Sequence, residues 1–342
     1  MESVQGLVVG VDTHKDTHSA AMVDELGGVL AALDVGANRN GYRSLLKWAR
    51  CQSSGRIWVV EGTGSYGAGL AAFLSAEGEV VFEGDRPQRR KRGAAGKSDQ
   101  LDAIKVAREA LARPHPAVPR RRGQREAIRI LLTTREGAVQ AYRQGLNQLY
   151  ALVVSAPEPI RERLIRLKGE QLIHACIRVR AASDLESSVT ATTMRQIARR
   201  LNLLLSEAAD YERQLAELVG AAAPSLLAEP GVGPITAAQV LISWSHAGRI
   251  RHEGAFAALA GVAPVPASSG RVVRHRLNHQ GDRQLNRALH VVALSRSSFH
   301  KPTRAYIARR TAEGKSTREI RRCLKRYLAR RFFRLLQRLD NP

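Results

Sequence analysis

Three short apolar segments joined by polar turns lie near the N-terminus, and they constrain the fold more than any other feature. They read GLVVGVD, HSAAMVD and VLAALDV, and they cover residues 6–12, 18–24 and 29–35. Apolar runs of this length, bounded by turn residues, are typical of β-strands. Because strands joined by such short turns run antiparallel, the segment predicts a three-stranded antiparallel sheet.

The next eighty residues alternate between helix-like and strand-like segments. In chain order they are an amphipathic helix at 40–50, a strand at 56–62, a helix at 68–78, a strand at 79–85 and a helix at 98–112. Three strands followed by this alternation predict an α/β domain with a mixed sheet.

The middle of the chain has a different period, with apolar positions that recur at alternating spacings of three and four. One set is Ile128, Leu132, Arg135, Val139, Tyr142, Leu146, Leu149 and Val153, and the other is Met194, Ile197, Leu201, Leu204, Ala208, Tyr211, Leu215 and Leu218. Such heptad patterns are typical of coiled coils. They predict a long antiparallel helical hairpin with residues 154–193 near its tip. A helical layer within one domain is the alternative.

The chain is strongly basic, with 54 Lys+Arg against 31 Asp+Glu, a net charge of +23 and a pI near 11.0. The helical tail from 301 to 342 contains 14 of these Lys+Arg residues and only 3 of the Asp+Glu residues. This balance favours a polyanionic partner.

We find neither a secretory signal nor an apolar run of about 18 residues, and we expect no membrane partner. The three isolated cysteines fit a reducing cytoplasm and form no zinc or disulfide pattern. We therefore expect a cytoplasmic protein that binds DNA or RNA.

Four carboxylates occupy positions where a metal site can form. Asp12 lies in the first strand, Glu61 ends the fourth, and Asp99 and Asp102 lie one helical turn apart. Two neighbouring strands and one packed helix can bring all four together. Oxygen ligands suit Mg²⁺ or Mn²⁺, and such ions can stabilise the attacking and leaving oxygens of phosphoryl transfer. Each residue alone also fits a turn, a cap or a favourable interaction with a helix dipole.

Two further motifs lie in the C-terminal third. The stretch EPGVGPITAAQVL at 229–241 resembles a helix-hairpin-helix, whose backbone N–H groups meet a phosphate, although a plain turn between helices is the alternative. The loop PVPASSG contains Ser268 and Ser269, and arginines follow it. A serine near cations can attack a phosphodiester, but such a loop can also be purely structural. Neither His275 nor His279 is singled out as a base by its spacing.

The basic residues that we expect to bind nucleic acid fall into groups before and after the middle region. They are Arg89, Arg90, Lys91, Arg92, Lys97, Arg120, Arg121, Arg122, Arg271, Arg274, Arg276, Arg283 and Arg287.

Several of these motifs together resemble a known family. GVDTHKDTH, EGTGSYG and KSDQLDA resemble the DEDD transposases of bacterial insertion sequences, and LLAEPGVGP, FAALAGVAPVPASSG and GDRQLNRAL look like their C-terminal transposase domain. These are the bridge-RNA-guided recombinases of the insertion-sequence 110/1111 family. The resemblance covers nearly the whole chain and is weakest at 154–193.

The resemblance implies a fold of the class α/β plus α. An N-terminal domain of the RNase H-like (RuvC-like) type would span 1–122, a helical coiled-coil linker 123–220, and a mostly helical C-terminal transposase domain 221–342. The latter would include the helix-hairpin-helix-like element and the basic tail.

The resemblance also implies a mechanism and partners. Asp12, Glu61, Asp99 and Asp102 match the family's metal-binding acids, and Ser269 matches its nucleophile, with Ser268 as the alternative. The serine would form a 5′-phosphoserine bond with DNA while an element is excised and inserted. The implied partners are an element-encoded bridge RNA, donor and target double-stranded DNA, and further copies of the chain, as a dimer assembling to a tetramer.

Two rival functions stay open on the sequence. One is a metal-dependent, structure-specific nuclease resembling a Holliday-junction resolvase, in which the serine loop is only structural. The other is a non-catalytic, architectural nucleic-acid-binding protein, which would have no use for four convergent carboxylates. Replacement of Ser269 separates the first rival from the recombinase, because a plain nuclease would keep full cleavage.

Overall fold

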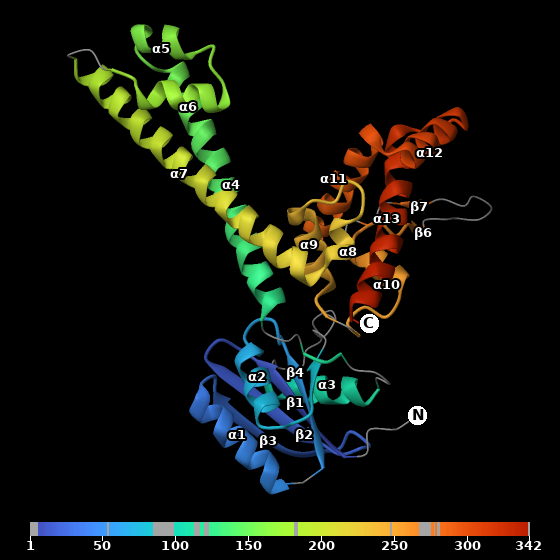
Figure 1. Ribbon diagram of the computed structural model, residues 1–342. Coiled ribbons are helices and arrows are strands. Elements are labelled where there is room, and N and C mark those ends of the chain that lie inside the picture. Colours follow the sequence, from blue (N-terminus) through green and yellow to red (C-terminus); the bar gives the residue numbers. More distant parts are fainter. Residues whose placement is uncertain are drawn as a thin grey trace. The chain divides into compact units, whose positions relative to one another are not determined.

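The computed structural model (Figure 1) describes most of the chain, and its helices and strands form two compact units. The described residues are 6–52, 55–84, 99–112, 117–119, 123–180, 184–246, 248–266, 275–276, 278 and 281–340. Unit 1 comprises Met1–Gly123, Ser243–Arg283 and Arg326–Pro342, and unit 2 comprises Gln124–Ile242 and Gln284–Lys325. The domain boundaries expected from the sequence stay predictions. Within the described ranges, no helix has the length and apolar character needed to cross a membrane.

Unit 1 contains a five-stranded mixed sheet with the order β3-β2-β1-β4-β5. Its strands are β1 (Leu7–Thr13), β2 (Thr17–Val23), β3 (Val29–Gly36), β4 (Arg56–Glu61) and β5 (Val81–Gly84). The first three strands pair antiparallel, whereas β4 runs parallel to β1 and β5 parallel to β4. The mixed α/β character predicted from the sequence is confirmed, and the strand order is consistent with an RNase H-like fold.

Helices cover both faces of this sheet. On one face, α1 (Arg39–Gln52) and α2 (Ala68–Ala76) bury leucines against alternate residues of β1, such as Val9 and Val11. On the other face, α3 (Asp99–Leu111) packs Val106 and its small neighbours against Val8. Because successive side chains of a strand point to opposite faces, Asp12 shares the α3 face with Val8 and Gly10.

Gly10 permits α3 to lie unusually close to the sheet. A Cβ atom added to Gly10 would lie 2.3 Å from the Ala103 carbonyl oxygen and 2.6 Å from the Ala107 backbone nitrogen. Only glycine, which has no Cβ, leaves room for this approach. The first turn of α3 is thereby held near the end of β1.

The start of β4 is fixed by a buried carboxylate that follows α2. The side chain of Glu79 is 7% exposed and accepts hydrogen bonds from the Trp58 indole at 2.9 Å and from Arg56 at 2.5 Å. Arg50 of α1 pairs with the same carboxylate at 3.1 Å. Burial raises the pKa of Glu79, but the bonds from Trp58 and the two arginines outweigh it and hold the pKa below its usual value.

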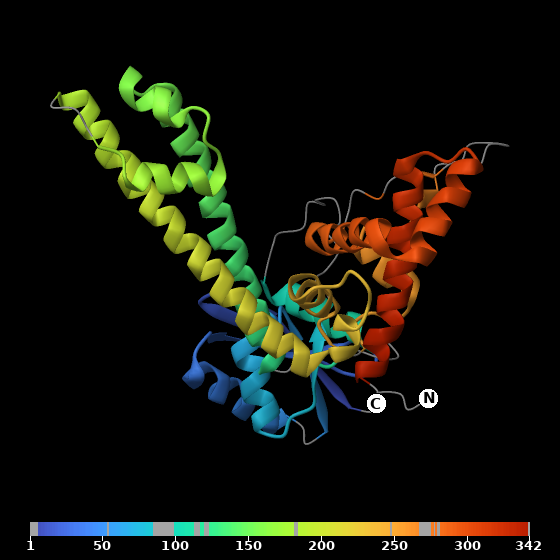
Figure 2. The same cartoon turned by 45° about the horizontal axis from the view of Figure 1, so that its top comes forward.

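Unit 2 contains a long helical arm, in which α4 (Gln124–Val154) and α7 (Leu185–Ala222) lie side by side (Figures 1 and 2). The short helices α5 (Glu158–Leu164) and α6 (Gly169–Ile177) pack with them through buried residues such as Leu149 and Leu201. The heptad positions therefore predicted the paired helices. Coiled-coil supercoiling of the pair stays a prediction.

The remaining helices complete the two units. They are α8 (Pro224–Leu227), α9 (Pro234–Trp244), α10 (Glu253–Leu259), α11 (Arg283–Phe299), α12 (Lys301–Ala312) and α13 (Thr317–Asp340). A short antiparallel pair, β6 (Val265–Pro266) and β7 (His275–Arg276), lies between α10 and α11 in the chain.

Candidate metal centre and nucleic-acid interface

The C-terminal ends of β1 and β4 bring two of the expected acids to one edge of the sheet. Val11 pairs with Val60 in the parallel register, so Asp12 and Glu61 are the next residues on adjacent strands. The Thr13 hydroxyl donates a hydrogen bond to the Glu61 carbonyl oxygen at 2.9 Å and ties the two strand ends together. Both acidic residues therefore follow buried strand segments and share the α3 face of the sheet.

The first turn of α3 adds a third carboxylate to this edge. Ligand atoms of Asp12, His14 and Asp99 all lie within 4.8 Å of one another. The Nδ1 atom of His14 is 3.7 Å from a carboxylate oxygen of Asp12. Side chains from a strand, the following turn and a helix thus converge on one small volume that could hold a cation.

Asp12 is the buried member of this group, with 7% of its surface exposed. Burial raises its pKa; His14 opposes this shift, whereas the negative charges of Asp102 and Asp99 add to it. No Lys or Arg pairs with Asp12 anywhere in the part of the chain that the structure describes. A carboxylate in this position is costly unless a cation compensates for its lost hydration.

Asp102 lies one turn further along α3, and its carboxylate forms an ion pair with Lys105. Its carboxylate is 2.6 Å from the Lys105 ammonium group, and its side chain is 27% exposed. Asp102 is close enough to raise the pKa of Asp12. The structure thus gathers Asp12 and Asp99 directly, with Asp102 in electrostatic range and Glu61 on the adjacent strand.

Sequence reasoning missed His14. His14 follows Asp12 by two residues, and residues at this spacing in a strand share one face. This spacing was the sequence signal that could have pointed to His14. The resulting donor set of carboxylate oxygens and one imidazole nitrogen fits a divalent cation. Carboxylates suit Mg²⁺ and Mn²⁺, and imidazole favours transition metals.

Many of the expected phosphate-binding and nucleophilic residues lie outside the described residues. These are Ser268, Ser269, Arg271, Arg274, Arg89, Arg90, Lys91, Arg92, Lys97, Arg120, Arg121 and Arg122. Arg276 is exposed on β7, and Arg283 is exposed at the start of α11. Arg287 pairs with Glu136 of α4 at 3.1 Å, so part of its charge is used inside unit 2.

The helix-hairpin-helix-like stretch forms a tight turn between α8 and α9. Gly231 has φ 75°, a conformation that favours glycine. The Arg296 side chain of α11 donates to the Pro230 carbonyl oxygen at 2.7 Å and to the Glu229 carboxylate at 2.9 Å. The turn is therefore anchored from both its backbone and its side chains. Phosphate binding by this turn stays a prediction.

The basic tail helix α13 has a structural as well as an electrostatic role. Leu328 and Phe332 are buried among the residues of unit 1. On another side of the helix, Arg330 pairs with Glu253 at 2.9 Å and Arg326 lies 3.8 Å from the same carboxylate. Part of the tail's positive charge is thus neutralised by contacts within unit 1.

Family comparisons agree with this arrangement. Residues 9–156 match a model described as a transposase, that of DEDD transposases of the IS110 type, and residues 223–308 match the model of the transposase IS116/IS110/IS902 family. The mixed sheet, its acidic strand ends and these matches define a DEDD-type transposase, an enzyme that acts on DNA and requires a divalent metal. Within that class, the chain belongs to the IS116/IS110/IS902 family.

Curated relatives come from insertion elements of Streptomyces and Mycobacterium species. The chain is 24% identical over 354 residues to the IS116 uncharacterized 44.8 kDa protein of Streptomyces clavuligerus, covering 90% of this chain and 88% of the relative. Identity to the IS900 uncharacterized 42 kDa protein of Mycobacterium paratuberculosis is 25% over 362 residues, covering 91% and 90%. The IS110 uncharacterized 43.6 kDa protein of Streptomyces coelicolor is 27% identical over 256 residues, covering 73% and 58%.

Proposed function

We propose that this transposase is an RNA-guided DNA recombinase that excises and inserts an insertion-sequence element by strand cleavage and exchange. The observation that carries the proposal is the convergence of Asp12, His14 and Asp99 at the edge of the sheet. Glu61 ends the adjacent strand, and Asp102 lies one turn along α3. This arrangement suits a cation, and the net charge of +23 suits a polyanionic substrate.

In the proposed site, Asp12, Glu61, Asp99 and Asp102 hold Mg²⁺ or Mn²⁺, and His14 supplies a nitrogen ligand. When bound, such ions stabilise charge on the attacking and leaving oxygens of a phosphoryl transfer. The protein contributes rigidity. Asp12 is fixed by its buried strand, and the Thr13 hydroxyl bond to Glu61 keeps the two strand ends in register.

The proposed covalent step uses Ser269, which matches the family's nucleophile, with Ser268 as the alternative. The serine Oγ loses its proton to a base and forms a bond with the scissile phosphorus, while the bond from phosphorus to the 3′ oxygen breaks. The 3′ oxygen takes up a proton, and a 5′-phosphoserine DNA bond remains. A 3′ hydroxyl of another strand then attacks this phosphorus and releases the serine.

The phosphoserine ester conserves the energy of the broken phosphodiester bond, so rejoining needs no nucleoside triphosphate. The chain accordingly has no GxxxxGK[ST] phosphate-binding loop. Arg271, Arg274 and Arg276 are the proposed stabilisers of the charge that develops on the phosphoryl group. A serine hydroxyl is a weak nucleophile at neutral pH and requires activation. In the proposal, the acidic site of another subunit supplies it.

The proposed partners follow from charge and family. Donor and target double-stranded DNA and an element-encoded bridge RNA bind through basic residues, and base pairing with the RNA supplies sequence specificity. A dimer that assembles to a tetramer places the serine of one copy beside the acidic site of another. The RNA and the oligomer rest on the family resemblance.

The test is a search for the covalent intermediate. Protein, guide RNA and DNA labelled next to the cleavage point are mixed, denatured and separated by electrophoresis. Label should migrate with the wild-type protein and with Ser268→Ala, and it should be absent with Ser269→Ala and with Asp12→Asn. An adduct that is lost only in Ser268→Ala would move the nucleophile by one position.

The same experiment distinguishes the rival nuclease, which the acidic cluster in unit 1 would also suit. A nuclease of the junction-resolvase type would cleave DNA in a metal-dependent reaction without any adduct. Full cleavage by Ser268→Ala and by Ser269→Ala would therefore refute the covalent step, and Asp12→Asn should still abolish cleavage.

A further inference from the structure

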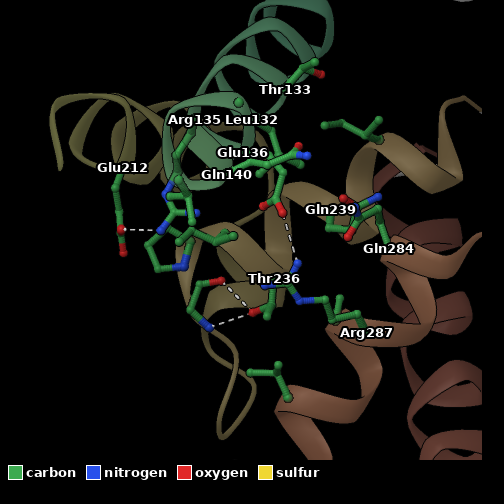
Figure 3. A pocket seen from close by; sticks show the side chains of 18 of the residues that line it. Leu132, Thr133, Arg135, Glu136, Gln140, Glu212, Thr236, Gln239, Gln284 and Arg287 are labelled. Carbon is green, nitrogen blue, oxygen red and sulfur yellow. Dashed lines mark hydrogen bonds and ion pairs between the residues drawn. The ribbon is translucent and has the colours of Figure 1, made fainter. Parts of the chain in front are cut away.

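Unit 2 contains a cavity of about 850 Å³ between α4, the turn that precedes α9, and α11 (Figure 3). The residues from α4 include Leu132 and Val139, those from α9 include Ile235 and Ile242, and α11 adds Val291. These side chains form an apolar lining. The volume lies in the range of sites that enclose a small organic group, which is about 300–1,000 Å³.

Polar groups interrupt this lining at separate points. Gln140, Gln239 and Gln284 each border the cavity, on α4, α9 and α11 respectively, and all three are labelled in Figure 3. An amide side chain carries both donors and an acceptor. Amides of this kind pair with the edges of nucleic-acid bases, while apolar walls accommodate their faces.

The charge at the cavity is positive. Glu212 is paired with Arg135 at 3.1 Å, and Glu136 is paired with Arg287 at 3.1 Å, as Figure 3 shows. Arg143 also borders the cavity, and it forms no ion pair with any residue that the structure describes. One positive charge is therefore left over for an anionic group.

The turn at the start of α9 lies on the same cavity. The Gly233 amide donates to the Thr236 hydroxyl at 3.0 Å, and that hydroxyl donates to the Gly233 carbonyl oxygen at 2.9 Å. This bond pair fixes the first turn of α9, whose N-terminal end carries partial positive charge. The turn and Arg143 thus both favour a phosphate, and the interior favours a planar group with polar edges.

We infer that this cavity binds one unpaired nucleotide of a nucleic-acid partner, with its base inside and its phosphate at the positively charged border. The inference rests on the proposed function, because it assumes that the chain binds DNA or RNA. A base enters such a pocket only when it is unstacked. The cavity therefore recognises a bulge, a loop or a flipped nucleotide rather than a fully paired duplex.

Gly137 provides a direct way to fill the cavity. It lies in α4 and borders the cavity, and a Cβ added to it would meet no atom within 4 Å. Gly137→Leu therefore adds an apolar side chain at the border of the cavity, with room for its Cβ, and it favours the helix because glycine is a poor helix former. Gly220 in α7 is the matched control, since it has equally open space but does not border the cavity.

The experiment measures filter binding of a perfectly paired 20-base-pair duplex and of the same duplex with one extra unpaired nucleotide. Both are made as DNA and as RNA. We expect the wild type to prefer the bulged duplex by about tenfold, the order expected when part of one base is buried against apolar walls. Gly137→Leu should lose this preference and keep its affinity for the paired duplex, and Gly220→Leu should behave like the wild type. Arg143→Gln should reduce the preference about threefold, because the variant loses a positive charge that attracts the phosphate.

The outcomes separate this inference from the proposed function. A preference seen with RNA alone assigns the cavity to the guide RNA, one with DNA alone to the substrate, and either supports the inference. Equal binding of paired and bulged duplexes by the wild type overturns it and leaves the proposed function standing, as does a preference that survives in Gly137→Leu. Failure of the wild type to bind any duplex or RNA overturns both.

Discussion

Gly10→Ala should damage the candidate metal centre from a distance, because the new methyl group pushes α3 away from the sheet. The added Cβ would lie 2.3 Å from the Ala103 carbonyl oxygen, whereas an ordinary contact begins at 3.4 Å. Relieving this overlap requires a displacement of about 1.1 Å. The added Cβ would also lie 2.6 Å from the Ala107 backbone nitrogen, so a shift of α3 along its own axis does not remove the overlap. The shift moves Asp99 and Asp102 relative to Asp12.

Two magnitudes follow from this displacement. Overpacking of a well-packed core costs about 1–3 kcal/mol in the free energy of unfolding. A misplacement of about 1 Å at a catalytic centre costs about 10²-fold in rate. Gly10→Ala should therefore remain folded at 25 °C while its metal-dependent DNA cleavage falls by about two orders of magnitude.

The assay combines denaturant unfolding, calorimetric titration with Mn²⁺ and DNA cleavage. Gly55→Ala is the matched control, because a Cβ at Gly55 would meet no atom within 4 Å and the residue directly precedes β4 of the same sheet. It should change stability by less than about 0.5 kcal/mol. Wild-type metal affinity and cleavage in Gly10→Ala would refute the argument that close packing of α3 positions the acids.

Three further results are expected. Glu79→Gln should cost about 3 kcal/mol of unfolding free energy at pH 7, because the buried Arg56 guanidinium loses the opposite charge beside it. Since the folded pKa of Glu79 is lowered, its stabilisation is present above about pH 4.5 and is lost as the pH falls through the folded pKa, so unfolding curves of the two proteins should converge in acid. His14→Ala should weaken Mn²⁺ binding about tenfold in calorimetric titration and weaken Mg²⁺ binding less, because imidazole favours transition metals; unchanged Mn²⁺ affinity would remove His14 from the ligand set. Affinity for duplex DNA should fall by about 10³ between 50 and 200 mM salt if at least about six phosphates are contacted, and a flat salt profile would contradict the charge argument.

The strands and the long helices were predictable because each depends on a local pattern. The apolar run 6–12 corresponds to β1 at Leu7–Thr13, and the heptad positions located α4 and α7. Spacing alone put Asp99 and Asp102 on one helical turn. In each case the information lies within about one element, where hydrophobic periodicity is the strongest signal.

The rest depended on contacts between distant residues. Nothing local indicates which face of the sheet α3 covers, and Gly10 becomes informative only once Ala103 lies against it. His14 joins Asp12 because the chain turns directly after β1. Arg287, expected at a phosphate, is partly engaged by Glu136, which lies 151 residues earlier in the chain. Such pairings follow from tertiary packing, which sequence periodicity does not encode.

The buried indole beside Glu79 has an optical consequence. All three tryptophans of the chain, Trp48, Trp58 and Trp244, belong to unit 1, and unit 2 has none. Trp58 is fully buried, so its fluorescence emission should shift to longer wavelength when the sheet opens to water. Emission therefore follows the unit that carries Asp12, whereas the amide absorption of the long helices is weighted toward unit 2. The protein thus contains separate optical reporters for its two units.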